Sequence, residues 1–469
     1  MSFMSGFDSK IAALKEKYSI KCNIPPLKIN GKTVETAIVQ GGMGVGISLS
    51  GLASAVADQG GVGVIAANAI GMIESDYYEN HIEANIRALK NEIRKAKKVK
   101  ERTIGVNIMV AVDCFSELLN TAIEEKVDIL FLGAGLPIKN IPVEKIREVN
   151  IAVVPIVSSG RAARLIFKSW EKLYGDLPDG VVVEGPKAGG HLGFKYERID
   201  HPDSQLETIV PEVVEVLSEF RNRYDRDIPV IAAGGIFSGE DIYRIMKLGA
   251  EGVQMGTRFV ATHECDADRR FKDVYVNAQE KDVKIINSPV GLPGRAVNNR
   301  FLQDIEAGVK KHFQCPSKCL DSCKAKDARY CISEALDNAR KGEFENGFAF
   351  AGSNVFKVNS VVSVKELFSD IKFEYAKTVV KEYLRGEYQN VSEKLSKIKS
   401  EYSDALSKVA FEMQESIRKT TLENEIKMKQ KMENVTEVII KLKEEYNIYL
   451  NKISQISEDL SLVNGELVN

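Results

Sequence analysis

Eight short apolar runs, each separated from the next by an amphipathic helical pattern, follow one another between Thr36 and Met255. A short apolar run bounded by turn residues is typical of a buried strand. We expect strands at Thr36–Val39, Val62–Ala66, Thr103–Ile108, Asp128–Leu132, Ile151–Val157, Val181–Glu184, Pro229–Ala232 and Gly252–Met255. The helical pattern is found at Ser50–Gln59, Glu79–Lys100, Ser116–Glu125, Gly160–Trp170, Gln205–Arg223 and Gly239–Leu248.

This alternation predicts an α/β fold, specifically a parallel (β/α)₈ TIM barrel. A doubly wound open sheet is the alternative, because runs this short do not by themselves fix closure. Residues of distinctive type at the carboxyl end of each run favour closure, since they would ring one mouth of a barrel. They are Gln40–Met43, Asn68, Asn107, Gly133–Gly135, Ser158–Gly160, His191, Gly234, Gly235, Gly256 and Thr257.

The chain divides into three expected regions. We place the barrel at 1–295, a small helical subdomain that contains cysteines at 296–371, and a long helical extension at 372–469. The extension lacks proline, and apolar residues recur in it at steps of three and four, which predicts amphipathic helices. A hairpin folded on itself and a coiled coil with another copy of the chain both fit this pattern, and docking on the barrel is a third arrangement.

Charge and composition narrow the class of protein. The 64 Lys and Arg residues nearly balance the 66 Asp and Glu residues, so no overall basic field favours nucleic acid. We see neither a signal-peptide pattern nor an apolar run long enough to span a membrane. Seven cysteines spread through a long chain are more typical of reduced thiols than of a disulfide framework. We therefore expect a soluble, cytoplasmic protein.

Glycine-rich turns follow three of the predicted strands. They are Glu184–Gly193, which contains His191, then Ala232–Ile236, and Gln254–Phe259. Consecutive backbone N–H groups at such turns hold a phosphate, because no Cβ blocks its approach. A lone histidine beside glycines on the strand before such a site indicates flavin chemistry.

Five motifs occur here in the order found in the nitronate monooxygenase (2-nitropropane dioxygenase) family, which the chain resembles over about residues 20–370. These motifs are Gln40–Gly44, Gly105–Asn107, Glu184–Gly193, Ala232–Ile236 and Gln254–Phe259. Members of that family are FMN-dependent TIM barrels, so the resemblance implies FMN as cofactor. The helical extension has no counterpart in the resemblance.

The resemblance also implies roles for individual residues. His191 would be the catalytic residue, since an imidazole titrates near neutrality and can move a proton or donate to an anion. The residues implied to bind FMN are Gly41, Gly42, Met43, Asn107, Gly189, Gly190, Ala233, Gly234, Gly235, Gly256 and Thr257. Core packing for Met43, and structural roles for Asn107 and His191, remain open.

Other polar residues have two interpretations each. Lys187 is either a cation beside the flavin or a solvated lysine, and the loop Asn287–Arg295 is either a lid whose arginine meets an anionic substrate or a plain connector. We take His81, His201, His263 and His312 as surface or structural residues. Free thiols are the simpler interpretation of a further cluster, with zinc or an iron–sulfur centre as the alternative: Cys315, Cys319, Cys323 and Cys331.

Three functions follow as hypotheses. The first is FMN-dependent oxidation of an alkyl nitronate, or another small electron donor, by O₂ to a carbonyl compound and nitrite. The second is an NAD(P)H-dependent flavin reductase of the enoyl-acyl-carrier-protein or quinone type. The third is a barrel that serves as a scaffold, with the helical extension as an assembly module that forms a homo-oligomer.

Overall fold

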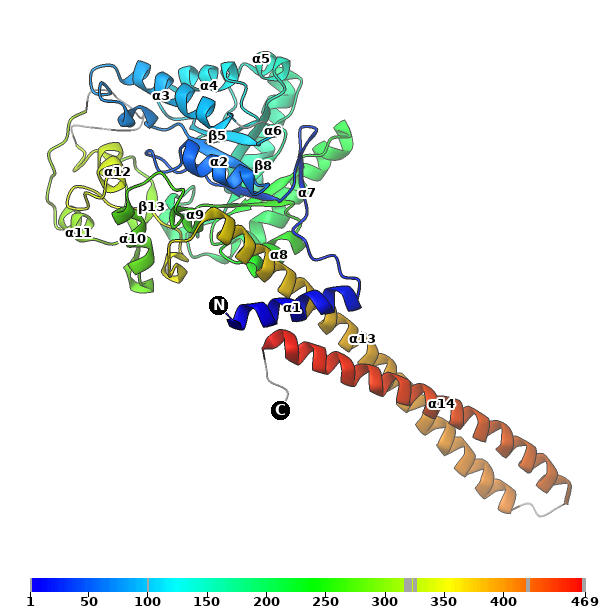
Figure 1. Ribbon diagram of the computed structural model, residues 1–469. Helices are drawn as coiled ribbons and strands as arrows, with labels where there is room; N and C mark the ends of the chain where they lie inside the picture. The colour runs from blue at the N-terminus through cyan, green and yellow to red at the C-terminus, as the bar shows by residue number, and fades with distance from the viewer. Residues whose placement is uncertain (1, 99–100, 316–322, 324–326, 419–421, 466–469) are drawn as a thin grey trace. The chain divides into compact units, whose positions relative to one another are not determined.

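The computed structural model describes residues 2–98, 101–315, 323, 327–418 and 422–465. It contains two compact units, one formed by Ile24–Lys372 and the other by Met1–Asn23 together with Phe373–Asn469 (Figure 1). No helix in the described ranges is long and apolar enough to cross a membrane.

The larger unit is a closed parallel barrel. Its strands run in the order β3-β11-β10-β8-β7-β6-β5-β4, and a parallel bridge between Val39 and Val62 joins the first to the last. The bounds are β3 Ile38–Gln40, β4 Gly63–Ala66, β5 Ile104–Met109, β6 Ile129–Gly133, β7 Ala152–Val157, β8 Val181–Glu184, β10 Val230–Ala233 and β11 Gly252–Met255. The predicted TIM barrel is confirmed, and the doubly wound alternative is wrong because the two edge strands hydrogen-bond to each other.

Helices connect these strands as the sequence predicts, with one addition. Short α5 escaped prediction, because six residues give too few turns for a clear period. The helices are α2 Ser50–Asp58, α3 His81–Ala96, α4 Phe115–Glu124, α5 Val143–Glu148, α6 Gly160–Tyr174, α7 Leu206–Tyr224 and α8 Gly239–Lys247. Beyond β11 come α9 Thr257–Val260, α10 Arg269–Asn277, α11 Arg300–Glu306 and α12 Ile332–Arg340.

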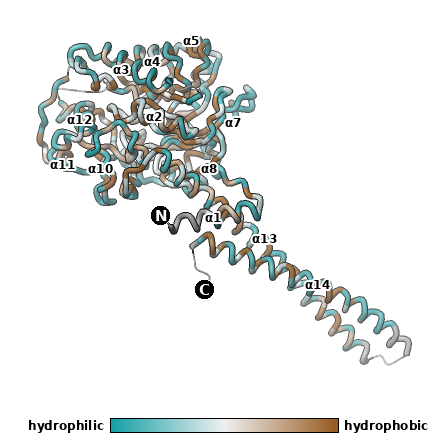
Figure 2. The backbone as a smooth tube through the Cα atoms, in the orientation of Figure 1, coloured by the Kyte–Doolittle hydropathy of each residue, from teal (hydrophilic) through white to brown (hydrophobic). Residues whose placement is uncertain are grey.

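The barrel strands are mostly apolar and buried, and Figure 2 shows hydrophobic segments in brown throughout the part of the chain that carries α2–α8. Every residue of β3, β4, β6 and β10 is buried, which explains why these strands appear as continuous apolar runs rather than alternating ones. Trp170 on α6 is fully buried, and its indole N–H donates to the Pro137 carbonyl at 2.7 Å. The strands are therefore held as a rigid frame beneath the loops at their carboxyl ends.

Two small antiparallel sheets accompany the barrel. A hairpin of β1 (Leu27–Ile29) and β2 (Lys32–Val34) precedes it. A second sheet has the order β12-β13-β9, formed by Val283–Asn287, Pro293–Val297 and Gly190–His191. The segment predicted as a lid or a connector, Asn287–Arg295, comprises the last residue of β12, the turn and the start of β13 in this hairpin. Whether it covers a bound cofactor stays a prediction.

The smaller unit consists of helices. These are α1 (Ser2–Lys17), the part of α13 (Val364–Ile417) from Phe373 onward, and α14 (Leu422–Asn464). Figure 1 shows α13 and α14 running side by side as a hairpin, and Lys452 of α14 pairs with Glu387 of α13 at 3.3 Å. The hairpin is the first of the arrangements that the sequence left open, and a coiled coil with another copy stays a prediction.

A buried cluster holds these helices together. It includes Ile11 and Leu14 of α1, Leu384 of α13 and Ile456 of α14. The buried carboxylate of Asp459 accepts hydrogen bonds from Lys17 Nζ at 2.7 Å and from the Tyr18 hydroxyl at 2.6 Å. Since a buried charge is tolerated only when it is paired, these bonds fix α14 against the end of α1.

Candidate active site

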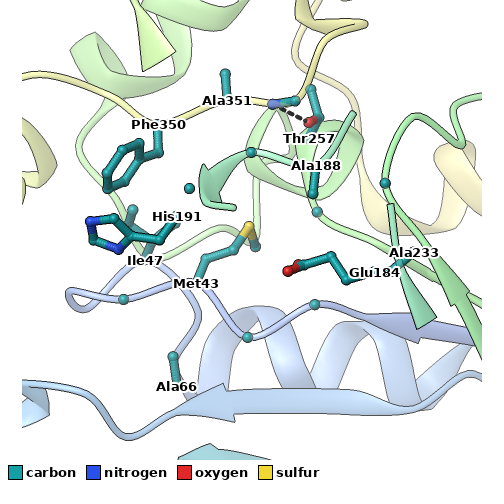
Figure 3. Close-up of a pocket in the computed structure, with 18 of the residues that line it drawn as sticks. Met43, Ile47, Ala66, Glu184, Ala188, His191, Ala233, Thr257, Phe350 and Ala351 are labelled. Atoms are coloured by element: carbon teal, nitrogen blue, oxygen red, sulfur yellow. Dashed lines mark hydrogen bonds between the residues drawn. The ribbon is translucent and has the colours of Figure 1, made fainter. Parts of the chain in front are cut away.

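A single cavity gathers all twelve residues to which the sequence assigned a role. It encloses about 1310 Å³ of space between protein atoms, part of it open to solvent. Its walls include Gly41, Gly42, Met43, Asn107, Gly189, Gly190, His191, Ala233, Gly234, Gly235, Gly256 and Thr257 (Figure 3). The residues thus come together from the carboxyl ends of β3, β5, β10 and β11 and from β9, as a TIM-barrel site requires.

Two of the expected positions do not reach this cavity. Neither Gly133–Gly135 after β6 nor Ser158–Gly160 after β7 lines it. Seven further wall residues come from parts of the chain beyond β11 to which the sequence gave no role in the site: Tyr275, Ile332, Ser333, Leu336 and Phe350–Gly352. The barrel mouth is therefore completed by α10, α12 and the segment at Phe350–Gly352.

The turn after β10 is shaped to receive an anion. Gly235 has φ +79°, and a Cβ added there would lie 2.9 Å from the Lys187 Cβ, so a side chain is excluded on both counts. The N–H groups of Gly235 and Ile236 make no hydrogen bond to the described part of the chain. Asn354 Nδ2 donates to the Gly235 carbonyl at 2.7 Å and so holds this turn, whose residues Gly235 and Ile236 line the cavity.

The turn after β11 provides a hydroxyl beside the first. Thr257 Oγ1 accepts a hydrogen bond from the Gly352 N–H at 3.1 Å, which leaves the hydroxyl hydrogen available to donate to a ligand. Free N–H groups and a hydroxyl at the ends of two adjacent strands suit the phosphate of FMN, which binds TIM barrels at the corresponding loops. The residues present therefore fit this cofactor.

The turn after β3 approaches Asn107 closely. A Cβ added to Gly42 would lie 2.9 Å from the Asn107 Cγ, so only glycine allows the two backbones this separation. Ser48 Oγ accepts a hydrogen bond from the Met43 N–H at 2.9 Å and fixes the turn. The Met43 side chain crosses the cavity toward Gly256, and the Asn107 amide has no hydrogen bond to the described residues, so it is available to a ligand.

His191 lies on β9, not at the end of a barrel strand. Its Nε2 is 2.7 Å from the hydroxyl oxygen of Ser288, and the ring of Phe350 packs edge-on against it with centroids 5.0 Å apart. Burial lowers the pKa of His191 from 6.5 to about 4, so the imidazole is neutral at neutral pH. The sequence missed Ser288 because only the pairing of β9 with β13 brings the two residues together.

Glu184 is a second titratable wall residue, and the sequence gave it no role. It ends β8, and Figure 3 shows its carboxyl directed into the pocket on the side of Met43. Burial raises the pKa of Glu184 from 4.5 to about 7. An acidic residue that closes the apolar run Val181–Val183 was the available signal, because a carboxylate at such a position leaves the barrel core for the mouth.

Lys187 lines the cavity with an exposed side chain, whereas Arg295 is not among the wall residues. Arg295 donates from Nη2 to the Pro186 carbonyl at 2.8 Å and so supports the loop that carries Lys187. His81, His201, His263 and His312 are also absent from the wall.

Cys315, Cys323 and Cys331 are not among the residues that line the cavity. Cys319 is outside the described residues, and the other three cysteines of the cluster form no disulfide within the described ranges. Within the described ranges, no three His, Cys, Asp or Glu side chains gather closely enough to hold a metal ion. The role of this segment stays a prediction.

Comparison with known proteins agrees with the geometry. A family model described as nitronate monooxygenase matches residues 26–374. A probable nitronate monooxygenase of Staphylococcus aureus is 28% identical in an alignment of 299 residues that covers 58% of this chain and 78% of that protein.

Solved structures show the same barrel. FabK from Thermotoga maritima has a TM-score of 0.59 at 29% identity, over 76% of this chain and 96% of that one. A nitroalkane oxidase from Streptomyces ansochromogenes has a TM-score of 0.57 at 21% identity, over 73% and 96% respectively. At that lower identity the likeness shows the fold alone.

Fold and site together define an FMN-dependent oxidoreductase built on a TIM barrel. Within that class, the chain belongs to the nitronate monooxygenase family. Membership sets aside the third hypothesis, a barrel without catalytic function. The match ends at residue 374, so most of α13 and all of α14 lie outside the part that the family shares.

Proposed function

We propose that the chain oxidises alkyl nitronates with O₂ at this cavity, releasing a carbonyl compound and nitrite. The description of the family model and the names of the curated relatives support this substrate class. The proposal depends on one observation: a neutral His191 lines the same cavity as the turns proposed to bind the FMN phosphate.

The low pKa of His191 favours a nitronate over the neutral nitroalkane. A base whose conjugate acid has a pKa of about 4 takes a proton from a carbon acid poorly. A nitronate is already deprotonated, so it needs only orientation and a hydrogen bond. The neutral imidazole carries one ring N–H, and this group can donate to a nitro oxygen without the cost of burying a charged ring.

The other wall residues have separate tasks in this mechanism. Gly235, Ile236 and Thr257 would hold the FMN phosphate, and Asn107 would orient the ring end of the cofactor. Bound FMN supplies the electron acceptance that the side chains lack. The ring of Phe350 packs against His191, and Leu336 adds apolar surface to the same cavity wall, so that water is excluded and each polar contact inside is strengthened.

Steady-state assays with and without deprotonated substrate test the proposal. The FMN-loaded protein, with O₂, should release nitrite from propyl nitronate, and its kcat/KM for neutral nitropropane should be at least about tenfold lower, because His191 is a weak base. Equal rates on the two forms would contradict the assigned role of His191. Absence of nitrite with both would overturn the proposed substrate class.

An NAD(P)H-dependent flavin reductase is the second candidate. The similarity to FabK from Thermotoga maritima, at 29% identity over 96% of that chain, supports this reductase candidate. This support is stronger than the support that the nitroalkane oxidase gives to nitronate oxidation, because the nitroalkane oxidase shares only the fold. Anaerobic mixing separates the candidates. Loss of the flavin absorbance within seconds of adding NADH or NADPH supports the reductase, whereas persistence of the absorbance supports the monooxygenase.

Assembly through the C-terminal helices is a separate proposal. Apolar side chains lie exposed on the hairpin, including Phe411 on α13 at 65% exposure and Ile440 on α14 at 51%. Large apolar side chains this exposed favour an interface with another molecule. Sedimentation should show an oligomer that Phe411→Glu dissociates, while Ala410→Glu, the same charge change on an exposed neighbour, leaves it intact.

A further inference from the structure

Within the described ranges, the carboxyl of Glu184 is the one acidic side chain on the cavity wall, and the mechanism above does not use it. It comes from the last residue of β8, whose register partner is Ala233, directly before the Gly234–Gly235 turn. Among the described residues, nothing donates a hydrogen bond to this carboxyl and no cation pairs with it. Glu184 is half-buried at the cavity wall. A carboxyl in a partly desolvated cavity without a partner is uncommon, because polar groups withdrawn from bulk water usually find one.

The other titratable groups on the wall do not neutralise it. Lys187, His191 and Tyr275 line the same cavity. Burial holds the imidazole of His191 in its neutral form and raises the pKa of the Tyr275 phenol far above its usual value. Lys187 has an exposed side chain and forms no ion pair with Glu184.

A bound FMN changes the electrostatics of this carboxyl. The phosphate monoester has a second pKa near 6, so the cofactor enters as a dianion above neutral pH. A dianion in the same partly desolvated cavity disfavours an ionised carboxylate, and a protonated carboxyl can donate a hydrogen bond that a carboxylate cannot. Both effects favour the protonated form of the Glu184 carboxyl.

We propose that Glu184 takes up a proton when FMN binds, so that the holoprotein carries a neutral carboxyl that donates a hydrogen bond to the cofactor. The unpartnered position of this side chain in the cofactor cavity carries the inference. It depends on FMN binding and not on nitronate oxidation, so the substrate assignment and the proton uptake can fail independently.

Calorimetry measures the proton directly. FMN is titrated into the full-length apoprotein at about pH 8 in two buffers with different ionisation enthalpies, and the difference in binding heat gives the protons taken up. At this pH the FMN phosphate and His191 have both completed their titrations, whereas the carboxyl of the apoprotein is mostly ionised. The wild-type protein should take up roughly 0.5–1 proton per FMN.

Two variants assign that proton. Glu184→Gln keeps the shape and a donor but cannot titrate, so its uptake should fall by the whole wild-type value while FMN still binds. Glu197→Gln removes an exposed carboxylate outside the cavity and should keep the wild-type value. An uptake by Glu184→Gln equal to that of the wild type, or no uptake by the wild type, overturns the proposal.

An infrared measurement covers the case in which Glu184→Gln binds no FMN. Wild-type holoprotein at about pH 8 should show the carbonyl stretch of a protonated carboxyl that the apoprotein lacks, because the linkage argument requires a neutral Glu184 only with FMN bound. A difference spectrum that contains only carboxylate bands overturns the proposal.

Discussion

The Nε2 of His191 and the hydroxyl oxygen of Ser288 lie 2.7 Å apart, although the two residues are 97 positions apart in the sequence. The contact exists because β9 pairs with β13, where His191 lies opposite Gly294, and Ser288 sits at the turn that precedes this strand. The hairpin thus fixes the ring of the candidate catalytic residue from outside the barrel. Its orientation depends on a sheet that is separate from the eight barrel strands.

Loss of the Ser288 hydroxyl should weaken catalysis moderately. A typical hydrogen bond contributes about 0.5–1.5 kcal/mol, so Ser288→Ala is expected to lower kcat/KM for the substrate by roughly 2- to 13-fold. Ser288→Thr retains the hydroxyl and should restore most of the rate. If alanine and threonine reduce the rate equally, the effect comes from packing in the turn and not from the bond to His191.

The imidazole of His191 should remain neutral far below its ordinary titration range. Burial places its pKa at about 4 in place of 6.5, so the ring gains its proton only as the pH falls through about 4. The His191 ring resonances in NMR spectra should stay constant from neutral pH down to about 5. His191→Gln assigns the resonances, and a midpoint near 6.5 would contradict the burial argument.

A methyl group at position 42 should impair FMN binding. The added Cβ would press on the Asn107 side chain, and overpacking of this kind costs about 1–3 kcal/mol, so Gly42→Ala should raise the Kd for FMN by roughly 5- to 150-fold. Gly386→Ala is the matched control, since a Cβ there meets nothing within 4 Å. Unchanged FMN affinity in Gly42→Ala would place the flavin away from Asn107.

Gly235→Ala tests which part of the cofactor the β10 turn holds. Alanine strains a residue at φ +79°, and its Cβ would collide with Lys187, so the turn must move. We expect the Kd for FMN to rise by at least about tenfold, while the Kd for riboflavin, which lacks the phosphate, changes much less. Equal losses for both ligands would show that the turn does not act through the phosphate.

The unfolding free energy of the apoprotein should depend on pH through the titration of Glu184. Its pKa in the folded state, about 7, exceeds the unfolded value of 4.5, so the folded state binds more protons between these values. The resulting stabilisation is fully present below pH 4.5 and is lost as the pH rises through about 7. Relative to Glu184→Gln, the wild type should lose roughly 3 kcal/mol of unfolding free energy across this window in denaturant titrations.

Glycine-rich turns explain why so much of the site could be predicted from the sequence. Gly42 and Gly235 occupy positions that exclude a side chain, so the requirement for glycine is visible in the sequence itself. The apolar runs likewise determine the strands, because residues buried on both faces must be apolar throughout. From these signals the barrel strands followed. The twelve proposed site residues were assigned through the resemblance of five motifs to the nitronate monooxygenase family, and all twelve line the cavity.

The tertiary structure alone decided what completes the site. Ser288 and Phe350 come from a hairpin and an irregular segment whose local patterns point to no ligand, and they contact His191 only through long-range pairing. Leu336, on a helix, reaches the same cavity wall. The sequence marks Glu184 only as an acidic residue that closes an apolar run, and its raised pKa arises because folding desolvates its carboxyl without providing a partner among the described residues. Local sequence determines the backbone conformation and the burial pattern. The desolvation of individual side chains and the contacts between distant segments exist only once the chain has folded.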